Sequence, residues 1–263
     1  SLHVEIFHRQ AGFPSAYLDS ADARIALADH LTRCLSAQFE TYNFKAKGSG
    51  KSGLISISCP GPEILERTAC ECCSDGIWIR LEAGFPANGR TINSGELIRI
   101  LFDFLPQCVK QVLFYKNRPV HEPEAVAELA EDQYFIRQEL KRLELVSFVA
   151  DGAILPRESG ISSRPMKNST PFSSPESMRI TLTLPHHGNC SGMAVRRGIT
   201  LIVGGGYHGK STLLKALEAG VYDHIAGDGR EFVITDDTAL KLRAEDGRSI
   251  RNVDISMFIN DLP

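Results

Sequence analysis

Apolar and polar positions along the first half of the chain follow the periods of both strands and helices. Residues 2–7 alternate between the two types, which is typical of a strand with one buried face. Residues 21–42 carry apolar side chains every three or four positions, and Ser20 precedes them as an N-cap residue. The same two patterns predict strands at 55–59 and 77–82 and helices at 94–115, broken at Pro106, and at 122–143. The first half is therefore expected to be a mixed α+β unit.

Strand patterns dominate the second half of the chain. Residues 146–156 are expected to form a hairpin with Asp151-Gly152 in its turn. Residues 157–177 are rich in Ser and Pro and lack apolar periodicity, so we interpret them as a connecting segment. Further strands are predicted at 180–184, 199–203, 232–235 and 239–243. This pattern predicts an N-terminal α+β domain over 1–156, the connecting segment over 157–177 and a second domain over 178–263.

A glycine-rich loop lies between the predicted strand at 199–203 and the start of a helix. Residues 204–211 read Gly-Gly-Gly-Tyr-His-Gly-Lys-Ser, which has the spacing of a phosphate-binding loop, G-x-x-x-x-G-K-S. Glycines let backbone N–H groups turn toward phosphate oxygens, and the positive end of the following helix faces the same place. The candidate nucleotide-binding residues are Gly204, Gly205, Gly206, Tyr207, His208, Gly209, Lys210, Ser211 and Thr212.

The side chains of this loop have separate expected roles. Lys210 supplies a positive charge for the β and γ phosphates, and the Ser211 hydroxyl is the expected ligand of Mg²⁺. Tyr207 and His208 stand where many such loops carry small residues. They either contact phosphate or a partner chain, or they only shape the turn.

A second Gly-Lys-Ser sequence, within residues 48–53, is not expected to bind a nucleotide. Lys45 stands where the first glycine should be, and residues 54–59 favour a strand, so no helix N-terminus supports the loop. Its lysines, Lys45, Lys47 and Lys51, could contact a nucleic-acid backbone. A solvated surface loop is the interpretation that the sequence favours.

Composition narrows the classes of protein without choosing among them. The 263 residues are 43% hydrophobic and 23% charged, as in a globular protein, and no apolar run reaches the length of a membrane span. A formal charge of −3 gives no overall attraction to nucleic acid, so such binding would need a local basic surface. The seven cysteines lack the regular spacing of a disulfide framework. The group Cys70, Cys72 and Cys73 lacks the second ligand pair of a structural zinc site, so reduced thiols are favoured.

Residues 198–214 resemble the Walker A region of the predicted ABC-class ATPases. Other segments of the chain resemble that family as well: 63–68, 148–157, 221–231, 243–249 and 254–263. The resemblance implies an α/β fold, with part of a P-loop ABC-type ATPase core preceded by a family-specific α+β domain. It also implies ATP or ADP and Mg²⁺ as ligands, and a homodimer, since ABC ATPases hold two ATP molecules between two head-to-tail subunits. One relative belongs to the mitochondrial RNA-binding machinery of trypanosomatids, which implies a mitochondrial location for that branch and a cytoplasmic one otherwise.

The chain departs from the ABC pattern after the phosphate-binding loop. The signature Ser-Gly motif and the Walker B carboxylate of ABC ATPases are absent from the residues after Thr212, and in this family both lie beyond the 260–263 segment. The sequence is therefore expected to be the N-terminal part of a longer protein. Four carboxylates after the loop are available: Asp236, Asp237, Glu245 and Asp246. None is expected to lie at the end of a buried strand after an intervening helix, so the catalytic residues stay unknown. Asp228-Gly229 and Asp246-Gly247 are interpreted as turns.

The expected function is that of an ATP-binding ABC-class ATPase that couples ATP binding and hydrolysis to RNA binding or remodelling. The candidate nucleic-acid contacts are Lys45, Lys47, Lys51, Arg80 and Arg90, with Trp78 nearby. Phe172 is a candidate for stacking on adenine, although an anchoring role in the connecting segment is favoured. Two other classes stay open: an interaction module that ATP only causes to dimerise, and a P-loop kinase acting on a small molecule.

Overall fold

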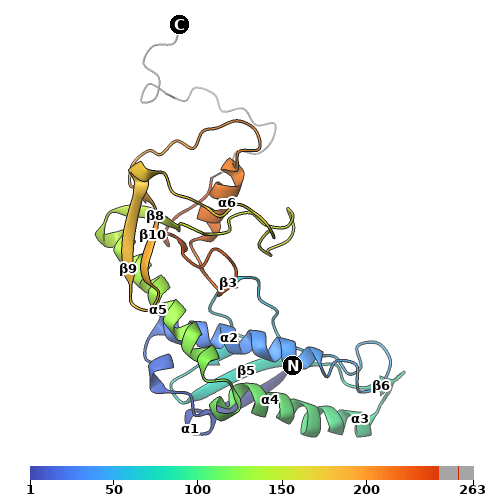
Figure 1. Ribbon diagram of the computed structural model, residues 1–263. Helices are drawn as coiled ribbons and strands as arrows, with labels where there is room; N and C mark the ends of the chain where they lie inside the picture. Colours follow the sequence, from blue (N-terminus) through green and yellow to red (C-terminus); the bar gives the residue numbers. More distant parts are fainter. Residues whose placement is uncertain (243–253, 255–263) are drawn as a thin grey trace.

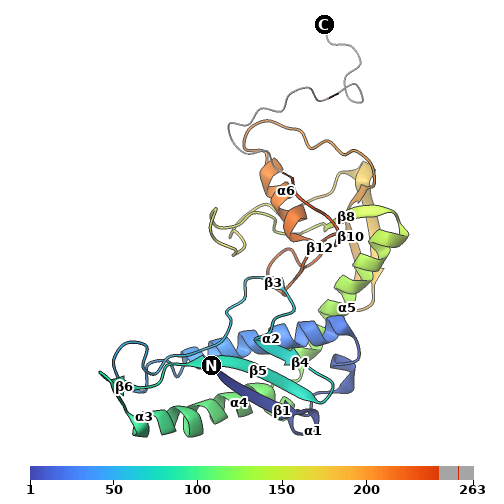
Figure 2. The same cartoon turned by 180° about the vertical axis from the view of Figure 1, so that it is seen from behind.

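The computed structural model describes residues 1–242 and residue 254. Two layered units share the long helix α5, His121–Arg142, which begins against the first unit and ends against the second (Figures 1 and 2). The first unit contains β1 Leu2–Phe7, α1 His8–Ala11, α2 Ala21–Glu40, β2 Ile55–Ser56, β3 Glu63–Ile64, β4 Cys70–Cys72, β5 Gly76–Ala83, β6 Ala87–Asn88, β7 Thr91–Ile92, α3 Ser94–Ile98 and α4 Leu105–Leu113. The second contains β8 Leu145–Ala150, β9 Arg179–Leu184, β10 Gly188–Arg196, α6 Lys210–Ala219, β11 Asp223–His224 and β12 Val233–Thr235.

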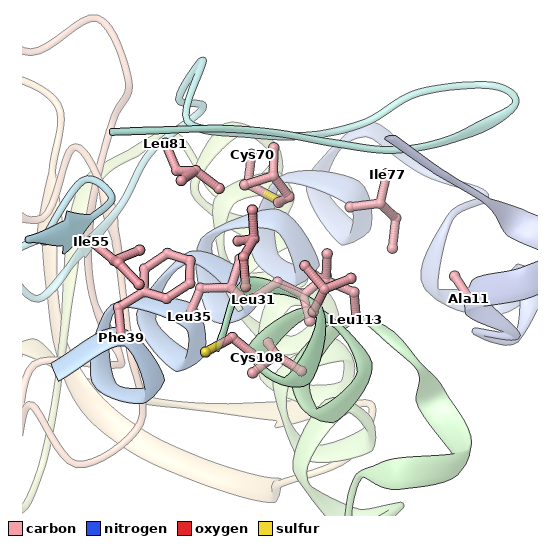
Figure 3. Close-up of a cluster of buried hydrophobic side chains, with 14 of the residues drawn as sticks. Ala11, Leu31, Leu35, Phe39, Ile55, Cys70, Ile77, Leu81, Cys108 and Leu113 are labelled. Atoms are coloured by element: carbon pink, nitrogen blue, oxygen red, sulfur yellow. The ribbon is translucent and has the colours of Figure 1, made fainter. Parts of the chain in front are cut away.

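The first unit is an antiparallel sheet covered by helices. Its central strand β5 pairs with β1 along one edge and with β4 and β2 along the other. Helix α2 begins where the sequence predicts it, because the Ser20 hydroxyl accepts a hydrogen bond from the Ala23 N–H at 3.0 Å. Figure 3 shows Leu31 and Leu35 of α2 meeting side chains of β5 and α4, and both leucines are fully buried.

The predicted helix at 94–115 continues through its proline. Pro106 has no N–H, and its ring would crowd the carbonyl four residues earlier in a regular α-helix. The chain adopts a π-helical stretch over Arg99–Phe104, between α3 and α4, and this wider turn makes room for the ring. The predicted break is therefore a change of helical pitch.

The second unit is an antiparallel sheet with a helix on each face. Its strand order is β12-β8-β10-β9, and successive side chains of β8 point to opposite sides. Phe148 faces the buried side chains Ile136 and Leu140 of α5, whereas Val149 belongs to the cluster that contains Ala216 of α6. Because both faces are covered, β8 is an almost continuous apolar strand.

Two strand predictions in the second unit are wrong. The hairpin over 146–156 does not form: the chain turns at Asp151-Gly152, but both edges of β8 are already paired, with β10 and β12. Residues 199–203 form no strand, and their apolar side chains are exposed. In the described part of the chain no strand pairs with them, so their backbone groups face solvent and their side chains stay exposed.

The ends of the other predicted strands differ in smaller ways. The strand at 55–59 is limited to Ile55–Ser56. Residues 239–242 form no strand, and Arg243 lies outside the described residues. The predicted domain division at 157–177 stays a prediction. Strand β8 precedes residues 157–177 in the chain but pairs with β10 and β12, which follow them, so the sheet of the second unit includes a strand from each side of this segment.

Candidate functional site

The glycine-rich loop ends at the N-terminus of α6, as predicted. Gly209 has a left-handed φ of 78° and is the N-cap, a conformation that glycine adopts without strain. The first helical hydrogen bond runs from the Leu213 N–H to the Gly209 carbonyl, so the N–H groups of the first turn have no helical acceptor. No acidic residue lies in this turn, which leaves the positive end of the helix available to an anion.

The side chain of Lys210 folds back under the loop. Its Nζ donates a hydrogen bond to the Gly204 carbonyl at 2.6 Å and another to the Gly205 carbonyl. The ammonium group therefore lies against the backbone of the glycine-rich loop. This places a positive charge at the loop that a phosphate would contact.

The remaining loop residues differ in position. The His208 ring packs against Gly205, where an added Cβ would lie 3.0 Å from the ring carbon Cε1. Tyr207 has a φ of 61° and a fully exposed side chain, so a bulky residue occupies a backbone region that disfavours it. Ser211 is exposed and Thr212 is half-buried. The structure thus brings Gly204, Gly205, His208 and Lys210 together and leaves Tyr207 in solvent.

Helix α6 is fixed to the sheet along its C-terminal half. Ala216 is fully buried in the cluster that includes Val149 and Val233, and Leu213 and Leu217 pack against it. The Thr235 hydroxyl donates a hydrogen bond to the Leu217 carbonyl at 2.7 Å. Phe172 packs against the same cluster, which gives it a core contact; its proposed stacking on adenine stays a prediction.

A buried polar network lies beyond the end of α6, and sequence reasoning missed it. His224 Nδ1 and Arg157 Nη2 both meet the Asp228 Oδ2 atom, at 2.6 and 2.7 Å, and His224 Nε2 lies 3.3 Å from the Ala219 carbonyl. Burial, and then the nearby Arg157 charge, lower the pKa of Arg230 to about 10. The Asp228-Gly229 turn is present, with Gly229 at a φ of 76°. No sequence signal marked this network, because charged residues in a turn are normally exposed, whereas Asp228 and Arg230 are buried.

The carboxylates after α6 are engaged elsewhere. Contrary to the expectation, Asp236 does follow a fully buried strand, β12, after an intervening helix. Its Oδ1 accepts hydrogen bonds from the Thr238 hydroxyl and N–H, which lower its pKa. Asp237 lies 3.7 Å from the Lys141 ammonium. Among the described residues neither carboxylate bonds to the loop, and Glu245 and Asp246 lie outside them.

The candidate nucleic-acid residues do not share one environment, because Arg80 lies apart from the other four. Lys45, Lys47 and Lys51 are exposed on a loop that leads into β2 and not into a helix, and Arg90 is exposed in the turn between β6 and β7. Arg80 is engaged by Glu71, whose Oε1 lies 2.6 Å from Arg80 Nη1. In the described part of the chain, Arg80 is the one member of this set with an ion-pair partner, and the Lys45 ammonium lies 4.5 Å from the centre of the Tyr42 ring.

The loop offers several groups that could bind a nucleotide phosphate but only one side-chain ligand for Mg²⁺. Free N–H groups, glycines and the Lys210 ammonium match the donors that phosphate oxygens require. The exposed Ser211 hydroxyl offers Mg²⁺ one ligand, and phosphate oxygens and water would supply the others. In the described residues no group of three or more His, Cys, Asp or Glu side chains could hold a metal ion.

Two family models match the chain. ABC_ATPase, a P-loop domain, matches residues 120–263, and ABC_N, the N-terminal part of ATPases of the ABC class, matches residues 1–116. The chain belongs to the ABC-class ATPase family. The mixed helix and strand fold, with a P-loop domain preceded by a family-specific N-terminal domain, is thereby confirmed.

A curated relative is an uncharacterized protein of Methanocaldococcus jannaschii. It is 32% identical over 140 residues, which cover 50% of this chain and 31% of the relative. The chain thus spans about a third of the length of the relative it matches. Within the described residues, no helix combines the length and the hydropathy needed to cross a membrane.

Proposed function

We propose that this ABC-class ATPase binds ATP, and ADP after hydrolysis, at residues 204–212. Lys210 leaves the two carbonyl groups of its own loop and neutralises the phosphates, while backbone N–H groups at the start of α6 donate to phosphate oxygens. The Ser211 hydroxyl would hold Mg²⁺, which would supply positive charge to the phosphates when bound. The observation that carries the proposal is the Lys210 ammonium held against the loop at the open end of α6.

Calorimetric titration with ATP and Mg²⁺ tests this site. Lys210→Ala is expected to weaken binding by at least tenfold, because a charge-assisted hydrogen bond to phosphate is lost. The matched control is Lys215→Ala, which removes an exposed lysine from the same helix. Equal affinity of the Lys210→Ala variant and the wild type would remove the assignment.

We also propose that two copies of the chain assemble head to tail around the nucleotides and that nucleotide binding is coupled to RNA. Support for a coupling comes from the junction of the two units. His224 of β11 lies opposite Glu63 of β3 in the first unit, and its ring meets the last turn of α6. A shift of α6 would therefore displace His224, which contacts residues of both units.

RNA affinity, measured without nucleotide, with ATP and with ADP, tests the coupling. A change of at least threefold between nucleotide states is the expected result, since coupling free energies of about 1 kcal/mol are common. Identical affinities would refute it. If sedimentation shows that ATP drives dimerisation while RNA does not bind, the chain is instead an ATP-dependent interaction module.

A further inference from the structure

We infer that one end of the N-terminal unit is a preformed platform for single-stranded nucleic acid, in which exposed aromatic rings stack on bases between lysines. The platform consists of residues 41–56 and 84–93. In Figure 1, β6 and α3 mark this end, far from the P-loop helix α6. The inference deepens the RNA binding proposed above and rests on it.

The two segments of the platform are held together by backbone hydrogen bonds. The Ser49 N–H donates to the Ala87 carbonyl at 2.8 Å, and the Gly53 N–H donates to the Gly84 carbonyl at 3.0 Å. The contact is so close that a Cβ on Gly84 would lie 1.8 Å from the Lys51 carbonyl oxygen. The exposed side chains of both segments therefore project from one fixed surface.

The charge of the platform is opposite to that of the whole chain. Segments 41–56 and 84–93 contain no Asp or Glu, and their cations are Lys45, Lys47, Lys51 and Arg90, whereas the chain carries a formal charge of −3. The Lys45 ammonium lies 4.5 Å from the centre of the Tyr42 ring, and the Tyr42 hydroxyl donates to Gln107 Oε1 at 2.8 Å. Lys45 is thus held in place and not free in solvent.

Two phenylalanines stand out of the same surface. Phe44 is 64% exposed and Phe85 is 49% exposed. Phe44 also has a φ of 60°, and its N–H donates to the Gly53 carbonyl at 3.0 Å, so the loop holds it in a left-handed conformation. A bulky residue is strained in this region, and such strain is concentrated at functional sites. Here the strained backbone holds an aromatic ring that is mostly exposed.

Charge and aromatic faces together favour one occupant. The two segments carry four cations and no carboxylate, and the exposed Glu40 and Glu82 border them. This local excess of positive charge attracts a polyanion rather than a mixed-charge protein surface. Exposed rings stack on bases whose faces are free, and bases in a duplex are already stacked on one another. Single-stranded RNA or DNA satisfies both conditions.

Fluorescence anisotropy of the full chain with a labelled twelve-nucleotide strand tests the platform. Phe44→Asn removes the ring and should preserve the fold, because Asn tolerates a left-handed φ. It is expected to weaken single-strand binding about tenfold and to leave the salt dependence unchanged. The matched control, Ile161→Asn, changes a fully exposed side chain outside the platform and should have no effect.

Each further outcome supports or overturns one part of the argument. A variant with Gln at Lys45, Lys47 and Lys51 should flatten the salt dependence; unchanged binding by it overturns the platform, because RNA would then bind elsewhere. Absence of RNA binding by the wild type overturns the proposed RNA binding itself. Equal affinity of Phe44→Asn and wild type, or a duplex bound as tightly as a single strand, overturns the stacking platform alone. Capture of an acidic peptide with no nucleic-acid binding would identify a protein surface instead and overturn the inference.

Discussion

The carboxylate of Asp228 is the point at which the buried network can be broken most cleanly. It is 4% exposed and receives Arg157 and His224 on one oxygen, and Arg157 also bonds to the Asp228 carbonyl at 2.8 Å. Asp228→Ala would leave the Arg157 charge, itself largely buried, without its counter-ion. Asp228→Asn keeps an oxygen at the position where both donors meet and removes only the charge.

These two substitutions have different expected costs. Removing one partner of a buried ion pair lowers the free energy of unfolding by about 3–5 kcal/mol, because the remaining charge stays buried. Hydrogen bonds to charged groups stabilise by about 1.5–3 kcal/mol and neutral ones by about 0.5–1.5 kcal/mol, so weakening two of them should cost about 2 kcal/mol. Asp228→Ala is therefore expected to be the more damaging change by at least about 1 kcal/mol.

Urea unfolding followed by circular dichroism and by tryptophan fluorescence measures both effects. The single tryptophan, Trp78, lies in β5 of the first unit, so a transition confined to the second unit changes the dichroism more than the fluorescence. The variant Arg157→Met and the double variant complete a cycle, in which a coupling of about 1–3 kcal/mol is expected. Equal costs of Asp228→Ala and Asp228→Asn would contradict the contribution of the accepting oxygen, because both variants lack the charge. Zero coupling between Asp228 and Arg157 would show that the charge pair does not stabilise the unit.

Three further results are expected. Gly84→Ala should destabilise the first unit strongly, because the added Cβ would clash with the Lys51 carbonyl. The control Gly89→Ala has open space around it and should lower the free energy of unfolding by only about 1 kcal/mol in melting experiments. Equal costs of the two variants would contradict the close approach at Gly84. The hydrogen bond and charge of Glu131 raise the pKa of His186, so this contact stabilises the fold below about pH 6.5 and is lost as pH rises through the raised pKa. His186→Gln should accordingly lower the melting temperature at pH 5.5 and not at pH 8.5, and a pH-independent difference would refute this. Burial raises the pKa of Cys190 to about 11, so mass spectrometry should find the exposed Cys59 alkylated first, and early labelling of Cys190 would contradict its burial.

Local sequence signals were sufficient to predict the elements whose stabilising contacts come from residues close by in the chain. Helix α2 has its N-cap at Ser20 and an apolar stripe, and α6 follows a glycine that can adopt a left-handed φ. The motif likewise located the loop and the lysine that folds beneath it. These features depend on neighbours within a few residues, which the sequence displays directly.

Features that depend on contacts between residues far apart in the chain could not be predicted from local sequence patterns. The apolar pattern at 199–203 has the composition of a buried strand, yet burial requires neighbouring strands, and none of those described pairs with it. The turn of the predicted hairpin at 146–156 is correct, but β8 pairs with β10 and β12, which come from later in the chain, and not with the residues after the turn. Arg157 and Asp228 meet across a separation of 71 residues, and no periodicity records such a contact.

The phosphate-binding loop and the body of its helix are stabilised by different contacts, which separates binding from folding. The C-terminal half of α6 contacts the sheet and His224 through Ala216, Leu217 and Ala219. Among the described residues, Lys210 hydrogen-bonds only to carbonyl groups of its own exposed loop. Lys210→Ala should therefore change the free energy of unfolding by no more than about 0.5 kcal/mol, as for other exposed substitutions. The same variant should lose nucleotide-dependent stabilisation, so its melting temperature should not rise when ATP and Mg²⁺ are added. A large loss of stability without nucleotide would mean that the lysine supports the loop rather than the ligand.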